Sequence, residues 1–274
     1  MTAFADLHHA DEPLLLPNAW DHASAAALAT GGFRAIGTTS LGVAAAAGVP
    51  DGASATRDET LRLALALGTE PFLLSVDAES GFSDDPDEVA EFARELAAVG
   101  AVGINLEDGL GSAARHAAKI TAVKSAAPGL FVNARTDTYW LRDGDGDGDR
   151  RETLDRLDAY QQAGADGVFV PGLTDPAEIT TLVGHLDVPL NILYSPTGPT
   201  VAHLIDLGVR RISLGSLLYR RALGAALETL ADVRAGRPPH GAVPTYADVQ
   251  AFSGCQSPVG QRETGDTASW RADW

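Results

Sequence analysis

Residues 72–79 read Phe-Leu-Leu-Ser-Val-Asp-Ala-Glu, a short apolar run that ends in acidic side chains. The pattern recurs at 102–108, Val-Gly-Ile-Asn-Leu-Glu-Asp, and at 130–137, Leu-Phe-Val-Asn-Ala-Arg-Thr-Asp. Continuous apolar runs of this length are typical of strands that are buried on both faces of a parallel sheet. Because consecutive parallel strands end on the same side of a sheet, we expect Asp77, Glu107 and Arg135 to converge on one spot.

Apolar runs of this kind alternate with longer amphipathic segments at a nearly even spacing along the chain. The expected strands are Leu14–Trp20, Ala35–Ser40, Phe72–Asp77, Val102–Glu107, Leu130–Arg135, Gly167–Pro171, Leu190–Tyr194 and Arg211–Gly215. The expected helices are Asp21–Thr30, Thr56–Gly68, Asp85–Val99, Ala113–Ala126, Asp149–Ala163, Asp175–Val183, Thr200–Leu207, Leu217–Ala235 and a short one at Tyr246–Phe252. In the third of these helices, apolar residues recur at three- and four-residue spacing, as one buried stripe requires.

Eight strand–helix units predict a (β/α)8 TIM barrel with a C-terminal helical extension. The competing arrangement is a doubly wound open sheet, but no Gly-x-Gly-x-x-Gly stretch separates a first strand from its helix. We place the barrel at residues 1–237 and the extension at 238–274, whose last ~18 residues have the composition of a loosely held segment. The Asp-Gly repeat at Asp143–Asp149 is predicted to be a flexible linker, since it lacks the glutamate that a calcium loop of this type needs.

Charge and composition exclude several classes of function. The net charge of −17 and the presence of only two lysines argue against nucleic-acid binding, which relies on clustered basic residues. No apolar run approaches the ~20 residues that a transmembrane helix needs, so no membrane association is expected. The single cysteine, Cys255, fits a reducing compartment, and the N-terminus lacks the basic region of a secretory signal. We therefore expect a cytoplasmic protein.

The acidic groups at the predicted strand ends are hard oxygen ligands. Asp77, Glu79 and Glu107 would raise one another's pKa if they lay close together, and a bound cation would relieve this repulsion. Magnesium prefers such oxygens, takes few protein carboxylates and keeps several waters. The alternative is that these carboxylates cap helices or pair with arginines, which applies most strongly to Asp108.

Arg135 ends its strand between Asn133 and Asp137. A guanidinium at this position can bind a substrate carboxylate in a bidentate manner, or stabilise an enolate as its charge develops. A structural salt bridge to Asp137 or Glu107 is the alternative interpretation.

Several motifs in a fixed order resemble the isocitrate lyase/phosphoenolpyruvate mutase superfamily over about residues 14–234. They are Pro17–Asp21, Thr38–Ala44, Gly48–Asp51, Asp77–Phe82, Gly103–Asp108, Asn133–Asp137, Phe169–Leu173 and Gly208–Ser213. The Asp-x-Glu form at Asp77 is similar to the mutase-like bacterial branch. The resemblance implies a Mg²⁺-dependent enzyme, with Mn²⁺ as a substitute, that acts on α-keto or enol acids. It also implies that the last helix packs on a neighbouring subunit of a homodimer or homotetramer.

The resemblance also implies roles for individual residues. Asp77 corresponds to the principal metal ligand, and Glu79 and Glu107 to outer ligands that act largely through water. The substrate, a small anionic carboxylate, would contact Trp20, Ser40, Leu41, Gly42, Asn133 and Arg135. The residues with catalytic roles would be Arg135, Ser40 and Asp51, the last of which lies in a gating segment after strand two.

Two departures from the superfamily pattern limit the choice of reaction. The segment after strand four, Gly109–Lys119, has no cysteine to act as the acid/base of the isocitrate lyases. The segment Gly52–Arg57 lacks the lysine and asparagine of phosphonomutase gating loops. We therefore expect a lyase or decarboxylase acting through an enolate on a small α-keto or 2-hydroxy di- or tricarboxylic acid. The alternatives are a phosphonopyruvate/phosphoenolpyruvate-type P–C mutase or hydrolase and a non-catalytic metabolite-binding barrel.

Histidines and lysines are weaker candidates. We expect His116 to be a surface residue in the first turn of a helix, His22 to be a helix-start residue, and His8 and His9 to belong to a disordered arm. Neither lysine follows a predicted strand, so Schiff-base chemistry is disfavoured.

Overall fold

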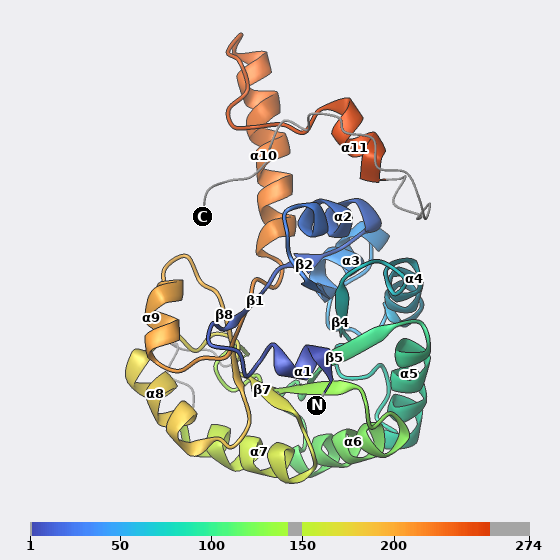
Figure 1. Cartoon of the computed structure of the whole chain (residues 1–274), viewed down its shortest axis with the longest axis vertical. Helices are drawn as coiled ribbons and strands as arrows, with labels where there is room; N and C mark the ends of the chain where they lie inside the picture. Colours follow the sequence, from blue (N-terminus) through green and yellow to red (C-terminus); the bar gives the residue numbers. More distant parts are fainter. Residues whose placement is uncertain (1, 142–149, 253–274) are drawn as a thin grey trace.

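The computed structural model describes residues 2–141 and 150–252, and it forms a ring of parallel strands surrounded by helices (Figure 1). The strands are β1 (Leu14–Leu16), β2 (Asn18–Ala19), β3 (Ala35–Thr38), β4 (Leu73–Asp77), β5 (Ala101–Glu107), β6 (Phe131–Arg135), β7 (Gly167–Phe169), β8 (Leu190–Leu193) and β9 (Arg211–Ser213). Their order is β1-β9-β8-β7-β6-β5-β4-β3-β2, and every pairing is parallel. The predicted TIM barrel is confirmed.

The first predicted strand is present as two short pieces on either side of Pro17. β1 pairs with β9, whereas β2 pairs with β3, so these two consecutive pieces join the two ends of the sheet. Proline has no N–H to donate, which accounts for the interruption of the ladder at this residue. Its carbonyl oxygen still accepts a hydrogen bond of 2.8 Å from the Gly37 N–H.

Most helices lie close to their predicted positions. They are α2 (His22–Thr30), α4 (Arg57–Leu67), α5 (Pro86–Ala98), α6 (Ala113–Ala126), α7 (Arg150–Gln162), α8 (Pro176–His185), α9 (Val201–Asp206), α10 (Leu217–Arg234) and α11 (Tyr246–Phe252). Two further helices, α1 (Ala3–Asp6) and α3 (Ser40–Ala47), were not predicted from the sequence. The Asp-Gly repeat and the residues after 252 lie outside the described residues.

The main hydrophobic core lies between the strands and the surrounding helices. On α5, the predicted apolar stripe is buried at Val89, Phe92, Ala93 and Leu96. The acidic and basic residues of this helix all lie outside the stripe, so the stripe decides which side faces the strands. This packing holds β4 and β5, whose ends carry the predicted acidic groups, in fixed positions.

A second, smaller core closes the interior of the barrel below the strand ends. Phe4 of α1 packs with Leu16, Ala35 and Phe131, and α1 lies within the ring of strands in Figure 1. Gly103 makes room for it, because a Cβ at that position would lie 2.7 Å from the Phe4 ring.

His8 belongs to this inner core as well, so the expectation of a disordered arm was wrong for this residue. Its ring stacks on Phe131 with a centroid distance of 4.2 Å, and it is 1% exposed. Burial, together with the charge of Arg211, lowers the pKa of His8 to about 3, so the ring is neutral at physiological pH.

α10 extends beyond the ring of strands, and α11 lies near it (Figure 1). A row of apolar side chains on α10 recurs at three- and four-residue spacing and is 51–69% exposed: Leu223, Leu227, Leu230 and Val233. Across the described segments, no helix combines the length and apolar character that a membrane span requires.

Candidate active site

The three strand-end groups meet on one rim of the barrel, as the sequence predicts. Asp77, Glu107 and Arg135 are the last residues of β4, β5 and β6. The register places Glu107 directly opposite Arg135, and their side chains form an ion pair of 2.7 Å between Oε2 and Nη1. The guanidinium also contacts Asp137 Oδ1 at 2.6 Å. The salt-bridge interpretation of Arg135 is therefore correct as a description of its contacts, although the side chain remains 15% exposed.

Asp77 is held from two sides. Its backbone N–H donates to Thr38 Oγ1 at 2.8 Å, and its Oδ2 accepts a hydrogen bond of 3.2 Å from the Ser40 N–H. Burial raises the pKa of the Asp77 carboxyl, whereas the charge of Arg135 and the hydrogen bond from Ser40 lower it. The Asp51 carboxylate raises it further, which places the gating segment within electrostatic range of Asp77.

Glu107 experiences the strongest crowding of charge. Burial raises its pKa to about 8, the Arg135 charge opposes this, and the carboxylates of Asp77, Asp137 and Glu79 add to it. The groups therefore interact with one another across the rim. A site with several buried carboxylates and one guanidinium has an excess of negative charge, which a hard divalent cation would relieve.

The geometry limits how such a cation would be held. Within residues 2–141 and 150–252, no three His, Cys, Asp or Glu side chains are arranged to ligate one ion together. Asp77 and Glu107 supply suitable oxygens, and the remaining coordination would come from water and substrate, as Mg²⁺ prefers. The donor set fits such an ion.

Glu79 is bound through its carboxylate by the segment between α3 and α4. Its φ of +47° is in the left-handed region, and the Ser80-Gly81 turn follows it. Its carboxylate accepts the Ser54 N–H at 3.2 Å and the Thr56 hydroxyl, and it is 2% exposed. Burial raises its pKa, and these two hydrogen bonds lower it.

The predicted carboxylate-binding loop is the start of α3. Ser40, Leu41 and Gly42 form its first turn, and within the described residues Thr39 makes no side-chain cap. The N–H groups at a helix start have no intrahelical acceptors and attract anions. Gly42 is required here, because a Cβ would lie 2.8 Å from both Trp20 Cβ and Thr39 Cγ2.

Aromatic rings lie beside this helix start and beside Arg135. Trp20 packs edge-to-face on Tyr219 of α10 with a centroid distance of 5.3 Å. Phe169, at the end of β7, lies 5.9 Å from the Arg135 guanidinium. The sequence analysis identified Trp20 but missed Tyr219. Tyr219 follows the last strand, β9, by a few residues, and a position just after a strand is the feature that identified the other rim residues.

Asn133 lies one layer below the rim. Its side chain is 1% exposed and donates to Asn105 Oδ1 at 2.8 Å, and the same oxygen accepts Arg211 Nη2 at 3.0 Å. Arg211 is fully buried, which lowers its pKa to about 9, while Asp77 opposes this shift. The structure thus places Asn133 in a polar layer beneath Arg135.

Asp108 has a structural role, as the arginine-pairing alternative proposed. Its Oδ2 accepts Arg156 Nη1 at 2.9 Å and the Tyr160 hydroxyl at 2.7 Å. Its Oδ1 accepts the N–H groups of Leu110 and Asp137 at 3.0 and 3.1 Å. This carboxylate joins the rim to α7.

The remaining candidates lie on helices rather than at the ends of strands. The expectation that His116 is a surface residue was wrong, since it is 4% exposed and packs edge-to-face on Tyr160. Burial lowers its pKa to about 4. His22 is the first residue of α2, as predicted, and its Nε2 lies 3.2 Å from Glu70. Lys119 and Lys124 lie on α6 rather than at a strand end.

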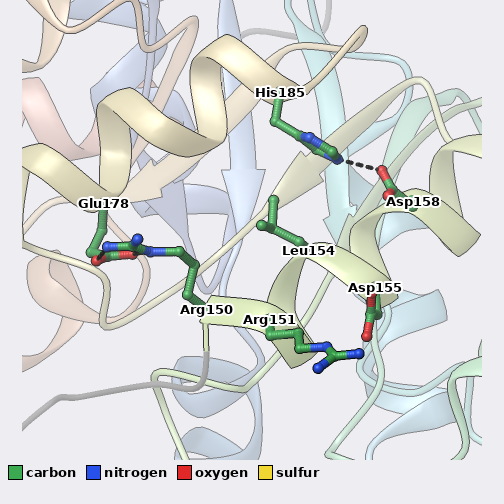
Figure 2. Close-up of a pocket in the computed structure, with 7 residues that line it drawn as sticks. All are labelled: Arg150, Arg151, Leu154, Asp155, Asp158, Glu178 and His185. Atoms are coloured by element: carbon green, nitrogen blue, oxygen red, sulfur yellow. Dashed lines mark hydrogen bonds and ion pairs between the residues drawn. The ribbon is translucent and has the colours of Figure 1, made fainter.

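A groove of about 590 Å³ lies outside the barrel, between α7 and α8 (Figure 2). Figure 2 shows Arg150 against Glu178 and His185 against Asp158, the latter pair at 2.8 Å. Its charges are largely paired and its lining includes none of the rim residues. We therefore place the active site at the rim.

The chain is similar to known proteins over most of its length. Residues 4–234 match the family described as phosphoenolpyruvate phosphomutase. An uncharacterized protein of Mycobacterium tuberculosis (strain H37Rv) is 46% identical over 253 residues, which cover 91% of this chain and 95% of that protein. The 2-methylisocitrate lyase of Bacillus subtilis (strain 168) is 30% identical, covering 74% and 70%. A crystal structure from Burkholderia cenocepacia J2315, provisionally named a lyase/mutase, is 34% identical with a TM-score of 0.80 over 93% of this chain and 95% of that chain.

Proposed function

The chain belongs to the phosphoenolpyruvate phosphomutase family of lyases and mutases, and on this premise we propose that it is a Mg²⁺-dependent lyase or decarboxylase. Its substrate would be a small α-keto or 2-hydroxy di- or tricarboxylic acid. The observation that carries this proposal is the contact of Arg135 with Glu107 at the rim, within electrostatic range of Asp77. The name of the Bacillus subtilis relative, a 2-methylisocitrate lyase, supports the same class of reaction.

The residues around the rim have separate tasks in this reaction. The first turn of α3 would bind one substrate carboxylate through its N–H groups and the Ser40 hydroxyl. A bound Mg²⁺ would polarise the α-carbonyl group. Arg135 would stabilise the negative charge on the enolate oxygen as the C–C bond breaks and its electron pair moves toward the carbonyl. Trp20 and Tyr219 would form an apolar wall that limits access of water.

The enolate carbon must then receive a proton. The segment after β5 supplies no cysteine for this purpose. Asp51 is exposed, and its charge acts on both Asp77 and Glu79, so it is our candidate for the acid/base group. In a decarboxylation, CO2 would leave the substrate carbon and the proton would add to that carbon in its place.

P–C bond chemistry is the second candidate, and the observation that favours it is the family match itself. Phosphorus NMR of phosphonopyruvate incubated with the protein and Mg²⁺ distinguishes the two. Loss of the phosphonate resonance with the appearance of a phosphate-ester or inorganic phosphate resonance would show P–C bond chemistry and would contradict the proposed C–C lyase.

Oxalate, an enolpyruvate mimic, is expected to bind only when Mg²⁺ is present, and Asp77→Ala is expected to abolish this binding. Isothermal titration calorimetry measures both. Asp187→Asn removes one exposed negative charge far from the rim and serves as the control. Oxalate binding that survives Asp77→Ala would show that the cation site is misplaced, and oxalate binding without turnover of any tested acid would favour a non-catalytic barrel.

We also propose that the protein forms a homodimer or homotetramer through α10. The apolar row of Leu223, Leu227, Leu230 and Val233 is too exposed for a helix end that stays in water. The double substitution Leu227→Glu and Leu230→Glu is expected to reduce the mass measured by light scattering to that of a monomer. Leu65→Glu, at a leucine that is 62% exposed on α4, should leave the mass unchanged. A monomeric parent protein would contradict the proposal.

A further inference from the structure

Both carboxylate oxygens of Glu79 are bound by the segment that connects α3 to α4. Oε2 accepts the Ser54 N–H at 3.2 Å, and Oε1 accepts the Thr56 hydroxyl. The backbone of Glu79 is fixed to the rim as well, because its carbonyl oxygen accepts the Glu107 N–H at 2.8 Å. Glu79 therefore connects the rim of the barrel to the α3–α4 segment.

Thr56 gives a second, independent indication of this link. It lies at the N-cap of α4, where a threonine hydroxyl ordinarily accepts a hydrogen bond from the first turn of the helix. In the described part of the chain it makes no such cap, and the hydroxyl donates to Glu79 instead. Its side chain is fully buried, so no water replaces the carboxylate. The Thr56 hydroxyl therefore binds Glu79 rather than capping its own helix.

The segment held in this way is exposed on its outer side. Residues 50–55 are all exposed, between the left-handed Gly48 at the end of α3 and Arg57 at the start of α4. Arg57 fixes the far end by pairing with Glu95 at 2.7 Å and lying 4.8 Å from the Phe92 ring. Between these anchors, Ser54 and Thr56 are the points at which the segment is tied to the rim.

We propose that Glu79 is a positioning residue that latches the 50–56 segment to the rim and so holds Asp51 over the site, rather than a ligand of the cation. Asp51 lies three residues before Ser54, whose N–H is bound by Glu79, and its charge acts on both Asp77 and Glu79. Each carboxylate oxygen of Glu79 already accepts a hydrogen bond from this segment, which occupies two of its roughly four acceptor sites and fixes the direction of the carboxylate. The role of Asp51 in this inference rests on the proposed function, but the latch itself does not.

Hydrogen–deuterium exchange of the 274-residue chain tests the latch without any assay of activity. Thr56→Val removes the hydroxyl at nearly constant volume and should raise exchange at residues 50–55 by about tenfold or more, the factor for losing a hydrogen bond to a charged acceptor. Glu79→Gln should do the same, since an amide keeps one acceptor oxygen only. Thr56→Ser restores the hydroxyl and should exchange as the parent does. Thr60→Val makes the same substitution at a buried threonine one turn later on α4 and serves as the control, which should leave exchange at residues 50–55 unchanged.

Calorimetry of Mg²⁺ with oxalate separates the latch from a role in cation binding. Thr56→Val and Glu79→Gln should each change the affinity for Mg²⁺ less than threefold, whereas Asp77→Ala abolishes binding. Unchanged exchange at 50–55 in Thr56→Val would overturn the proposal, and so would a loss of Mg²⁺ affinity confined to Glu79→Gln. If a substrate is found, Thr56→Val should lower kcat more than it changes KM, and Thr56→Ser should rescue it. Failure to find any substrate would count against the proposed function and leave the exchange result standing.

Discussion

Arg135→Lys is expected to lower kcat/KM by a factor of about 10² to 10³ while the protein remains folded. The guanidinium contacts Glu107 Oε2 and Asp137 Oδ1 at 2.7 and 2.6 Å, and the side chain remains 15% exposed. A lysine can retain the charge, but it lacks the planar arrangement of donors that serves two carboxylates and an enolate oxygen together. The loss should therefore appear in kcat rather than in the stability of the fold.

Arg135→Met should have a further effect that depends on pH. The positive charge opposes the rise in the pKa of Glu107, which burial has already brought to about 8, so removing the charge raises this pKa further. A carboxyl whose pKa is raised in the folded state is more easily protonated there than in the unfolded state. Its contribution to the free energy of unfolding is complete below the unfolded pKa of about 4.5 and is lost as the pH rises through the folded pKa. The free energy of unfolding of Arg135→Met should therefore fall, relative to the parent, as the pH rises above about 8, where Glu107 is ionised in the folded parent but still protonated in the folded variant.

Urea denaturation at several pH values and steady-state kinetics measure these two effects. Arg94→Lys, in an exposed ion pair with Glu91 on α5, is the matched control and should change neither. Activity of Arg135→Lys within a factor of five of the parent would show that the guanidinium is only a structural partner of Glu107 and Asp137.

The rim could be predicted from the sequence because its members follow a local rule. Each apolar run ends in its functional residue, and the parallel register then brings Glu107 opposite Arg135. Glu79 departs from this rule because the chain turns with a positive φ directly after β4, so the two-residue periodicity of a strand no longer applies. Its binding to Ser54 and Thr56 joins segments 25 and 23 residues apart, and no local pattern marks such a contact.

The two missed helices have physical reasons of their own. α1 has four residues, which is too short for a period of 3.6 to be recognised. α3 consists of small and apolar residues without a polar face, so its composition reads as a buried connection rather than as an amphipathic helix. Missing α1 also led to the wrong expectation for His8, since the contact with Phe131 exists only because α1 enters the barrel.

Asp108→Ala is expected to destabilise the fold by about 3–5 kcal/mol, the cost of removing one partner from a buried ion pair. The Asp108 side chain is fully buried, and its oxygens accept hydrogen bonds from Arg156, Tyr160 and two backbone N–H groups. Burial acts to raise the pKa of Asp108, but hydrogen bonds from the Tyr160 hydroxyl and from the N–H groups of Leu110 and Asp137 act in the opposite direction, and the pKa lies below its ordinary value of 3.8. The contribution to stability is therefore complete at neutral pH and is lost only as pH falls through the lowered pKa.

The origin of this cost can be tested by removing the other charge as well. Arg156→Met alone should also destabilise the protein, but the double variant Asp108→Ala/Arg156→Met should lose less than the sum of the single losses, because neither charge is then left unpaired. Asp158→Asn, at a carboxylate that is 41% exposed and paired with His185, should cost no more than about 1 kcal/mol. Additive losses in the double variant would mean that Asp108 and Arg156 stabilise the fold independently. Because Asp108 also holds the N–H of Asp137, which contacts Arg135, folded Asp108→Asn should show a lower kcat with an unchanged affinity for Mg²⁺.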